Sequence, residues 1–131
     1  MTHSPIIQIT KRFTFEADHT LPAARHHGPC ARAHGHSYKL EVTVAGLIKS
    51  QPGANDHGMV MDFADLVHLV QQAVIEILDH QDLNQITGCY TTAENLVVWV
   101  WDRLEAAGLQ SMQRIRLWET ETGWVTLEKP A

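Results

Sequence analysis

Two stretches of the chain alternate between apolar and polar residues, and this pattern limits the possible folds more than any other feature of the sequence. Between residues 7 and 17 the odd positions are apolar except for Lys11, and between residues 38 and 44 the even positions are apolar. Because successive side chains of a strand point to opposite faces of a sheet, each stretch predicts a strand with one buried face. A third alternation over residues 114–119 and a short run from Trp124 to Glu128 predict two further strands.

Two segments between these strand pairs carry apolar residues at the spacing of one helical face. The first follows Asp62, a candidate N-cap, and extends to about Asp79. The second begins at Thr91, where Thr91 and Glu94 have the spacing of a capping box, and Gly108 is a natural C-terminal stop. The order strand, strand, helix, helix, strand, strand predicts an α+β fold in which two helices cover one face of a four-stranded antiparallel sheet.

A sheet of this kind has two open edges in a single chain, and natural proteins usually pair or blunt such edges. We therefore expect a homo-oligomer that forms through the sheet edges. The length of 131 residues fits one domain that spans residues 1–131.

The composition excludes several classes of function. Ten Lys+Arg residues against fifteen Asp+Glu residues give a net charge of -5, so the chain lacks the basic surface that binding to nucleic acid requires. No apolar run reaches the roughly 18 residues of a membrane helix, and the first residues lack the pattern of a signal peptide. Two cysteines are too few for a disulfide framework. We expect a cytoplasmic protein that binds neither membranes nor nucleic acid.

Nine residues are histidine, a density that packing and solubility do not require. His34 and His36 are two positions apart in the apolar series of one strand, so both side chains lie on the same face, and His19 continues the apolar series of the preceding strand. If these strands pair as antiparallel neighbours, three imidazoles converge at one end of the hairpin. Three histidines with an open fourth position are typical of a catalytic zinc site. The competing interpretation is that His34 and His36 are core or loop histidines that bind no metal.

Three other features are consistent with chemistry, and the residues alone leave each open. Cys30 lies four positions before His34. A thiol at this position has three competing interpretations: a fourth zinc ligand, an inert side chain or a reactive thiolate. Asp79 and His80 form a carboxylate–imidazole pair suited to proton transfer, or a charge cluster at a helix end. Glu119 interrupts an apolar face and needs a partner, either a structural arginine or a ligand with N–H donors.

Six motifs, taken in order, resemble the 6-pyruvoyl-tetrahydropterin synthase family. They are Phe13–His19, Cys30–His36, Met61–Leu66, Leu78–Asp79–His80 with Leu83–Asn84, Thr92–Asn95 and Trp118–Thr120. The combination of Cys-x3-His-Gly-His with the distant Asp-His is specific, and the motifs look like those of bacterial 6-carboxytetrahydropterin synthases, enzymes of queuosine synthesis. Three positions depart from the family pattern, which often has a small residue at Asp18, a basic residue at Thr20 and a proline at Thr91.

The resemblance implies a T-fold (tunnelling fold), in which subunits join their sheets edge to edge into a barrel and the active sites lie between subunits. It also implies Zn²⁺ held by His19, His34 and His36. The implied substrate is 7,8-dihydroneopterin triphosphate, and the implied products are 6-carboxy-5,6,7,8-tetrahydropterin, acetaldehyde and triphosphate. The alternatives are triphosphate elimination to 6-pyruvoyl-tetrahydropterin, or a module that binds pterin or metal without catalysis.

The resemblance further implies roles for five residues. Cys30 corresponds to the cysteine that abstracts a proton, and Asp79 with His80 corresponds to the relay that tunes this cysteine or acts as the acid. Glu119 corresponds to the carboxylate that anchors the N–H edge of the pterin ring, and Thr92 belongs to the supporting pocket.

Overall fold

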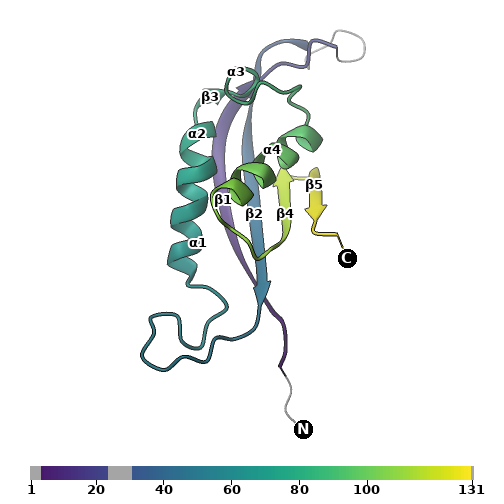
Figure 1. Cartoon of the computed structure of the whole chain (residues 1–131). Helices are drawn as coiled ribbons and strands as arrows, with labels where there is room; N and C mark the ends of the chain where they lie inside the picture. Colours follow the sequence, from purple (N-terminus) through teal and green to yellow (C-terminus); the bar gives the residue numbers. More distant parts are fainter. Residues whose placement is uncertain (1–3, 24–30, 131) are drawn as a thin grey trace.

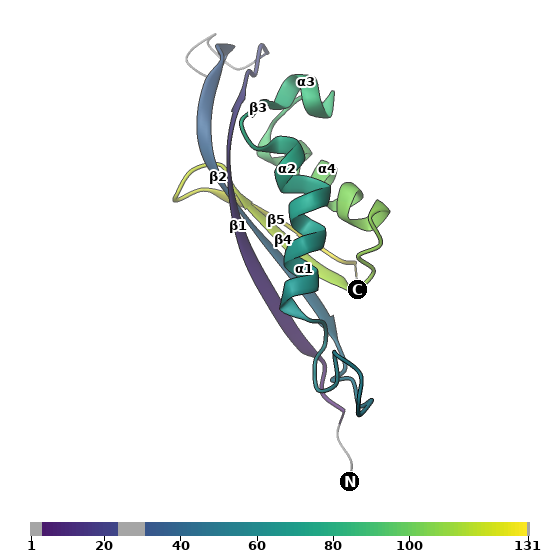
Figure 2. The same cartoon turned by 90° about the vertical axis from the view of Figure 1, so that its left-hand side faces the viewer.

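The computed structural model describes residues 4–23 and 31–130. In chain order the elements are β1 (Ile7–His19), β2 (His34–Gly46), α1 (Phe63–Val70), the π-helical segment η3 (Gln71–Ile75), α2 (Glu76–Leu78), β3 (Gln81–Asp82), α3 (Leu83–Thr87), α4 (Ala93–Ala106), β4 (Met112–Trp118) and β5 (Trp124–Glu128). Figure 1 shows the long β1–β2 hairpin with the helices in front of the sheet. In Figure 2, turned by 90°, the helices lie on one face of the sheet only.

The described strands form a single sheet in the order β3-β1-β2-β4-β5. β1 and β2 are antiparallel over their whole length, from the pair Ile7–Gly46 to the pair His19–His34, and β4 and β5 continue the antiparallel arrangement. The α+β class is confirmed. The expectation of four purely antiparallel strands is wrong, because the two-residue strand β3 pairs in parallel with Ala17 and Asp18 of β1. A strand of two residues is too short to leave an alternating pattern in the sequence.

The first predicted helix is present, but it is not a uniform α-helix. Asp62 is its N-cap, as predicted, and accepts the backbone N–H of Ala64 at 2.8 Å. The π-helical segment Gln71–Ile75 separates α1 from α2 and adds a residue to the local turn. This wider turn buries Ala73 and Ile75 as well as Val74, the one residue of the three that the 3.6-residue period predicts on the apolar face.

The second predicted helix, α4, begins one residue later than expected. Its N-cap is Thr92, whose Oγ1 accepts the backbone N–H of Asn95 at 3.2 Å, so the prediction of Thr91 as the cap is wrong. Thr91 is fully buried and hydrogen-bonded elsewhere. The short helix α3 was not predicted at all.

The core lies between the sheet and the helices. The predicted inward positions are buried from Phe13 to Ala17 of β1 and from Tyr38 to Val44 of β2, whereas Ile7 is exposed and Ile9 is only half-buried. The sheet packs against apolar residues of α1 and α4 that are almost completely buried: Leu66, Val70, Leu96, Val100 and Leu104. His19 and His36 belong to the same face at the end of the hairpin, so the histidines lie at one end of this core. Within the described ranges, no helix is long and apolar enough to cross a membrane.

Candidate metal centre

Three imidazoles meet where β1 ends and β2 begins. The antiparallel register places His19 directly opposite His34, and the pleat places His36 on the same face, two positions along. The ring centroids are 4.5 Å apart for His19 and His34, 5.1 Å for His19 and His36, and 4.9 Å for His34 and His36. One ring nitrogen from each residue lies within 4.8 Å of the others. The predicted convergence is therefore confirmed, while the role of these residues as metal ligands stays a prediction.

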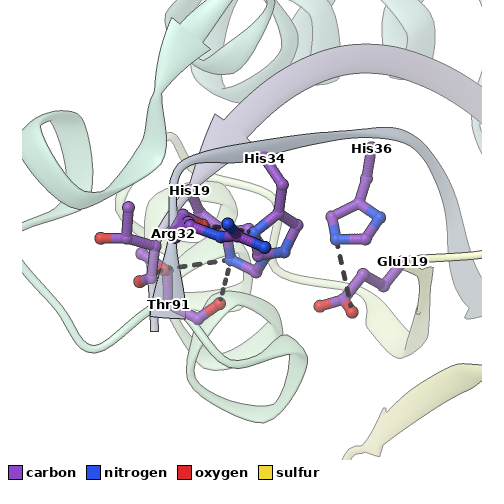
Figure 3. Close-up of polar contacts among 7 residues, drawn as sticks. His19, Arg32, His34, His36, Thr91 and Glu119 are labelled. Atoms are coloured by element: carbon purple, nitrogen blue, oxygen red, sulfur yellow. Dashed lines mark hydrogen bonds and ion pairs between the residues drawn. The ribbon is translucent and has the colours of Figure 1, made fainter. Parts of the chain in front are cut away.

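Hydrogen bonds fix the tautomer of two of the rings (Figure 3). The Nδ1 atom of His19 lies 2.9 Å from the carbonyl oxygen of Thr91, and Nδ1 of His34 lies 2.7 Å from the carbonyl oxygen of Arg32. Because a carbonyl oxygen only accepts hydrogen bonds, each Nδ1 carries the proton and each Nε2 presents a lone pair. Such a bond from the second nitrogen is typical of histidines that bind metals.

The residues present fit a bound zinc ion. The Nε2 atoms of His19 and His36 are buried and have no hydrogen-bond partner among the described residues. An unsatisfied buried polar group costs about 1–3 kcal/mol, so two of them in one cluster point to a shared partner that accepts lone pairs. Three imidazole nitrogens are a donor set that suits Zn²⁺.

The electrostatics of the cluster favour neutral imidazole. Burial lowers the pKa of His36, the neighbouring His19 and His34 lower it further, and the Glu119 carboxylate opposes this change. A lowered pKa keeps His36 neutral at pH 7, and neutral imidazole is the form that binds a metal ion.

Glu119 follows β4 directly and lies beside the cluster. Its Oε1 atom is 3.7 Å from Nε2 of His36, as Figure 3 shows, and within the described part of the chain it makes an ion pair with no arginine. Glu119 and Thr92 line the same cavity of about 280 Å³, together with Trp124 of β5. Among the described residues, therefore, no arginine is the structural partner of Glu119; Arg25 lies outside them.

Asp79 and His80, for which the sequence leaves a role in proton transfer open, lie apart from the histidines. Asp79 accepts the backbone N–H of Glu16 at 2.9 Å through Oδ1, and its Oδ2 lies 3.0 Å from Nδ1 of His80. The bond from Glu16 and the contact with His80 hold the pKa of Asp79 below its usual value. His80 has a φ of 60°, a left-handed conformation that costs a residue with a Cβ about 1–2 kcal/mol. In the described residues, neither side chain makes a hydrogen bond or ion pair with the three histidines, and Cys30 lies outside those residues.

Two residues that support the site were not predicted. Thr91 contacts His19, and Asn84 bonds to the backbone of Thr20, the residue that follows His19. The capping-box spacing of Thr91 and Glu94 gives no signal for the contact with His19. Asn84 belongs to one of the six motifs, but neither its residue type nor its spacing indicates this role. Tyr38 lies beside the cluster, and its ring stacks on that of Phe15 with the ring centroids 4.9 Å apart.

Comparisons with known proteins agree with this architecture. Residues 8–130 match the protein family described as 6-pyruvoyl tetrahydropterin synthase. The 6-carboxy-5,6,7,8-tetrahydropterin synthase of Synechocystis sp. is 39% identical over 115 residues, which cover 87% of each chain. The 6-pyruvoyl tetrahydrobiopterin synthase of Dictyostelium discoideum is 30% identical over 134 residues, covering 93% of this chain and 96% of the relative.

The fold also matches solved structures of this family. The structure of Caenorhabditis elegans 6-pyruvoyl tetrahydropterin synthase superposes with a TM-score of 0.82, covers 99% of this chain and 100% of that one, and is 22% identical in sequence. The T-fold implied by the sequence motifs is therefore confirmed. On the match over residues 8–130 and the relatives that cover most of its length, this chain belongs to the 6-pyruvoyl tetrahydropterin synthase family.

Proposed function

We propose that this chain is a cytoplasmic, zinc-dependent lyase that converts 7,8-dihydroneopterin triphosphate and one water molecule into 6-carboxy-5,6,7,8-tetrahydropterin, acetaldehyde and triphosphate, as a step in queuosine precursor synthesis. The observation that carries the proposal is the convergence of three imidazoles, two of them with buried and unpartnered Nε2 atoms, beside the Glu119 carboxylate. The name of the Synechocystis relative supports this choice of product.

The three histidines would hold Zn²⁺ through neutral nitrogens and leave a fourth coordination position open to substrate. When bound, zinc supplies a Lewis acid that makes the C–H bonds next to a hydroxyl more acidic. The Nδ1 bonds of His19 and His34 keep both rings in the orientation that this task requires.

Glu119 would select the pterin ring. A carboxylate accepts two parallel N–H donors, and such charge-assisted pairs are stronger than neutral hydrogen bonds. The cavity of about 280 Å³ next to Glu119 has a size suited to a small bicyclic ring. Thr92 caps α4 through the lone pairs of Oγ1, so its hydroxyl proton remains free to donate to a ligand in the same cavity.

We assign proton transfer to Cys30, Asp79 and His80. The contact with Asp79 holds the His80 ring through Nδ1 and leaves Nε2 available, and the His80 side chain is 76% exposed. In this arrangement a thiolate of Cys30 removes a proton and the Asp79–His80 pair tunes it or supplies the acid.

Asp79 and His80 lie beside Glu16 of β1, close to an open edge of the sheet, which suggests that a second chain completes the site. On the side away from β2, β1 pairs only with β3, at Ala17 and Asp18. Residues 7–15 of β1 have no neighbouring strand on that side among the described residues. β5 forms the opposite edge of the sheet (Figure 1). It begins at Trp124, which lines the same cavity as Glu119. Pairing β5 of one copy with β1 of the next would bring the Glu119 cavity close to the neighbouring Asp79–His80 pair. We therefore propose a homo-oligomer with active sites between subunits.

A second candidate function is triphosphate elimination to 6-pyruvoyl-tetrahydropterin. The relative from Dictyostelium discoideum, whose alignment covers 93% of this chain, carries the name of that activity. Both reactions begin with the same substrate and use the same metal, so they differ only in the products.

The test is product identification. The zinc-loaded protein is incubated with 7,8-dihydroneopterin triphosphate, pterins are identified by mass spectrometry, and acetaldehyde is trapped as a hydrazone. We expect 6-carboxy-5,6,7,8-tetrahydropterin and acetaldehyde in equal amounts. Triphosphate release without acetaldehyde would favour the second candidate. No turnover of any pterin despite bound zinc would refute both reactions and indicate a module that binds without catalysis.

A further inference from the structure

Thr91 lies behind His19 as part of a buried hydrogen-bonded network. The Thr91 side chain is 0% exposed and His19 is 1% exposed. The Nδ1–H group of His19 donates to the carbonyl oxygen of Thr91 at 2.9 Å and lies 3.2 Å from its Oγ1 atom. The Thr91 hydroxyl in turn donates to Oδ1 of Asn84 at 3.2 Å. Ring, hydroxyl and carboxamide therefore form one chain of contacts.

Asn84 holds the backbone that follows His19. Its Oδ1 accepts the N–H of Thr20 at 2.8 Å, and its Nδ2 donates to the carbonyl oxygen of Thr20 at 3.0 Å. One carboxamide thus satisfies both polar groups of the same residue, as a neighbouring strand would. Because β3 pairs with β1 only at Ala17 and Asp18, the Asn84 side chain continues that contact past the end of the strand.

The local sequence explains how Asn84 reaches this position. Asp82, the last residue of β3, caps α3 by accepting the N–H of Asn84 at 3.0 Å. Gly88 ends α3 with a φ of 67°, a left-handed conformation that glycine adopts without a steric penalty. The five-residue helix is therefore fixed at both ends, and its second residue presents the carboxamide to Thr20.

We propose that Asn84 and Thr91 are positioning residues of the metal centre, which set both the backbone and the ring orientation of His19. The inference rests on the proposed zinc site and adds two residues to it. If Thr91 only filled space, an apolar residue of the same shape would serve equally well in so buried a place. Instead its hydroxyl contacts the ring of His19 and donates to Asn84, the residue that binds the backbone of Thr20.

The first test compares two buried threonines. Thr91→Val removes the hydroxyl and keeps the shape, and the zinc Kd is measured by competition with a chromophoric chelator. The matched control is Thr43→Val, because Thr43 is 3% exposed, bonds to Thr10 at 2.7 Å and lies on β2 about 23 Å from His36. Loss of partners in the outer shell of a metal site typically weakens metal binding 10–100-fold, so we expect at least a tenfold weaker Kd for Thr91→Val and an unchanged Kd for the control.

A second pair of variants separates positioning from folding. Asn84→Asp keeps the size of the side chain but replaces the donor to the Thr20 carbonyl with an oxygen, so it should weaken zinc binding by a similar factor. Thr91→Ser restores a hydroxyl and should restore the affinity. The absorption spectrum of the Co²⁺-loaded protein should change in Thr91→Val and return to the wild-type spectrum in Thr91→Ser, whereas a fault in folding alone would lower thermal stability without this pattern.

Two results would overturn the inference while leaving the proposed function intact: wild-type zinc affinity in both Thr91→Val and Asn84→Asp, or an equal loss in Thr91→Val and Thr43→Val. Failure of the wild-type protein to bind zinc at all would instead refute the proposed zinc enzyme and this inference together.

Discussion

The His36→Leu variant should be more stable than the wild-type protein when metal is removed, and it should gain nothing from added zinc. His36 makes no side-chain hydrogen bond in the described residues, its Nε2 atom is buried, and the nearest acidic oxygen, in Glu119, is 3.7 Å away. Leucine fills a similar volume and leaves no polar atom unsatisfied. Such a group costs about 1–3 kcal/mol, and since the His36 side chain is still 17% exposed we expect a gain near the lower limit, about 1 kcal/mol.

Urea unfolding followed by circular dichroism measures the free energy of unfolding with and without zinc, and thermal unfolding measures the corresponding Tm. With a chelator present, about 1 kcal/mol corresponds to a rise in Tm of roughly 3–5 °C for a domain of this length. With free zinc at about 100 times its Kd, the wild-type protein should gain about 2.7 kcal/mol and the variant none. The control is His68→Leu, which replaces an exposed histidine of α1 and should leave the response to zinc unchanged. The reasoning is refuted if the metal-free variant is less stable than wild type, or if zinc stabilises both proteins equally.

Three further predictions concern the proposed catalytic and binding residues. Cys30→Ala should bind zinc with wild-type affinity and lose about 10²–10⁴-fold in kcat, whereas Cys89→Ala should keep the wild-type zinc affinity and kcat. A zinc titration measures the affinity, and steady-state kinetics measure kcat. Glu119→Gln should raise the KM for the pterin substrate roughly tenfold or more, because one acceptor oxygen becomes a donor, and an unchanged KM would contradict the anchoring role. The folded-state pKa of Asp79 lies below its usual value of 3.8, so its contribution to stability is present above pH 3.8 and is lost as the pH falls through the folded-state pKa. Asp79→Asn should therefore reduce the fall in stability at acid pH, as measured by urea midpoints between pH 2 and 6.

The strand pairing at the site could be predicted because alternation carries information about both strands at once. Once the odd positions of β1 and the even positions of β2 face the core, His19, His34 and His36 must share that face. Adjacent antiparallel strands then place the end of one beside the start of the next. The prediction needed only the side-chain period and the loop between the strands.

The support around the cluster could not be predicted, because it depends on contacts between residues that are far apart in the sequence. The capping-box spacing favours Thr91, because Glu94 lies three positions after Thr91 and only two after Thr92. The contact with His19, 72 positions away, is what places Thr91 in the core and leaves Thr92 as the cap. The parallel strand β3 follows the turn at His80, and its two residues show no period. Asn84 is placed by a five-residue helix that no periodicity can reveal.

The same register also explains why the donor set contains only nitrogen. Asp18 precedes His19 and pairs with Gly35, and its carboxylate lies on the opposite face of the sheet, where a Cβ added to Gly35 would meet Oδ1 at 2.7 Å. The His34-Gly35-His36 sequence therefore presents two imidazoles to the core and leaves room for a carboxylate behind them. A slip of one residue would exchange the faces and bring Asp18, Gly35 and Ser37 to the core in place of the imidazoles, so the cluster of three nitrogens would be lost. The convergence of three imidazoles thus depends on strand register as much as on the identity of the histidines.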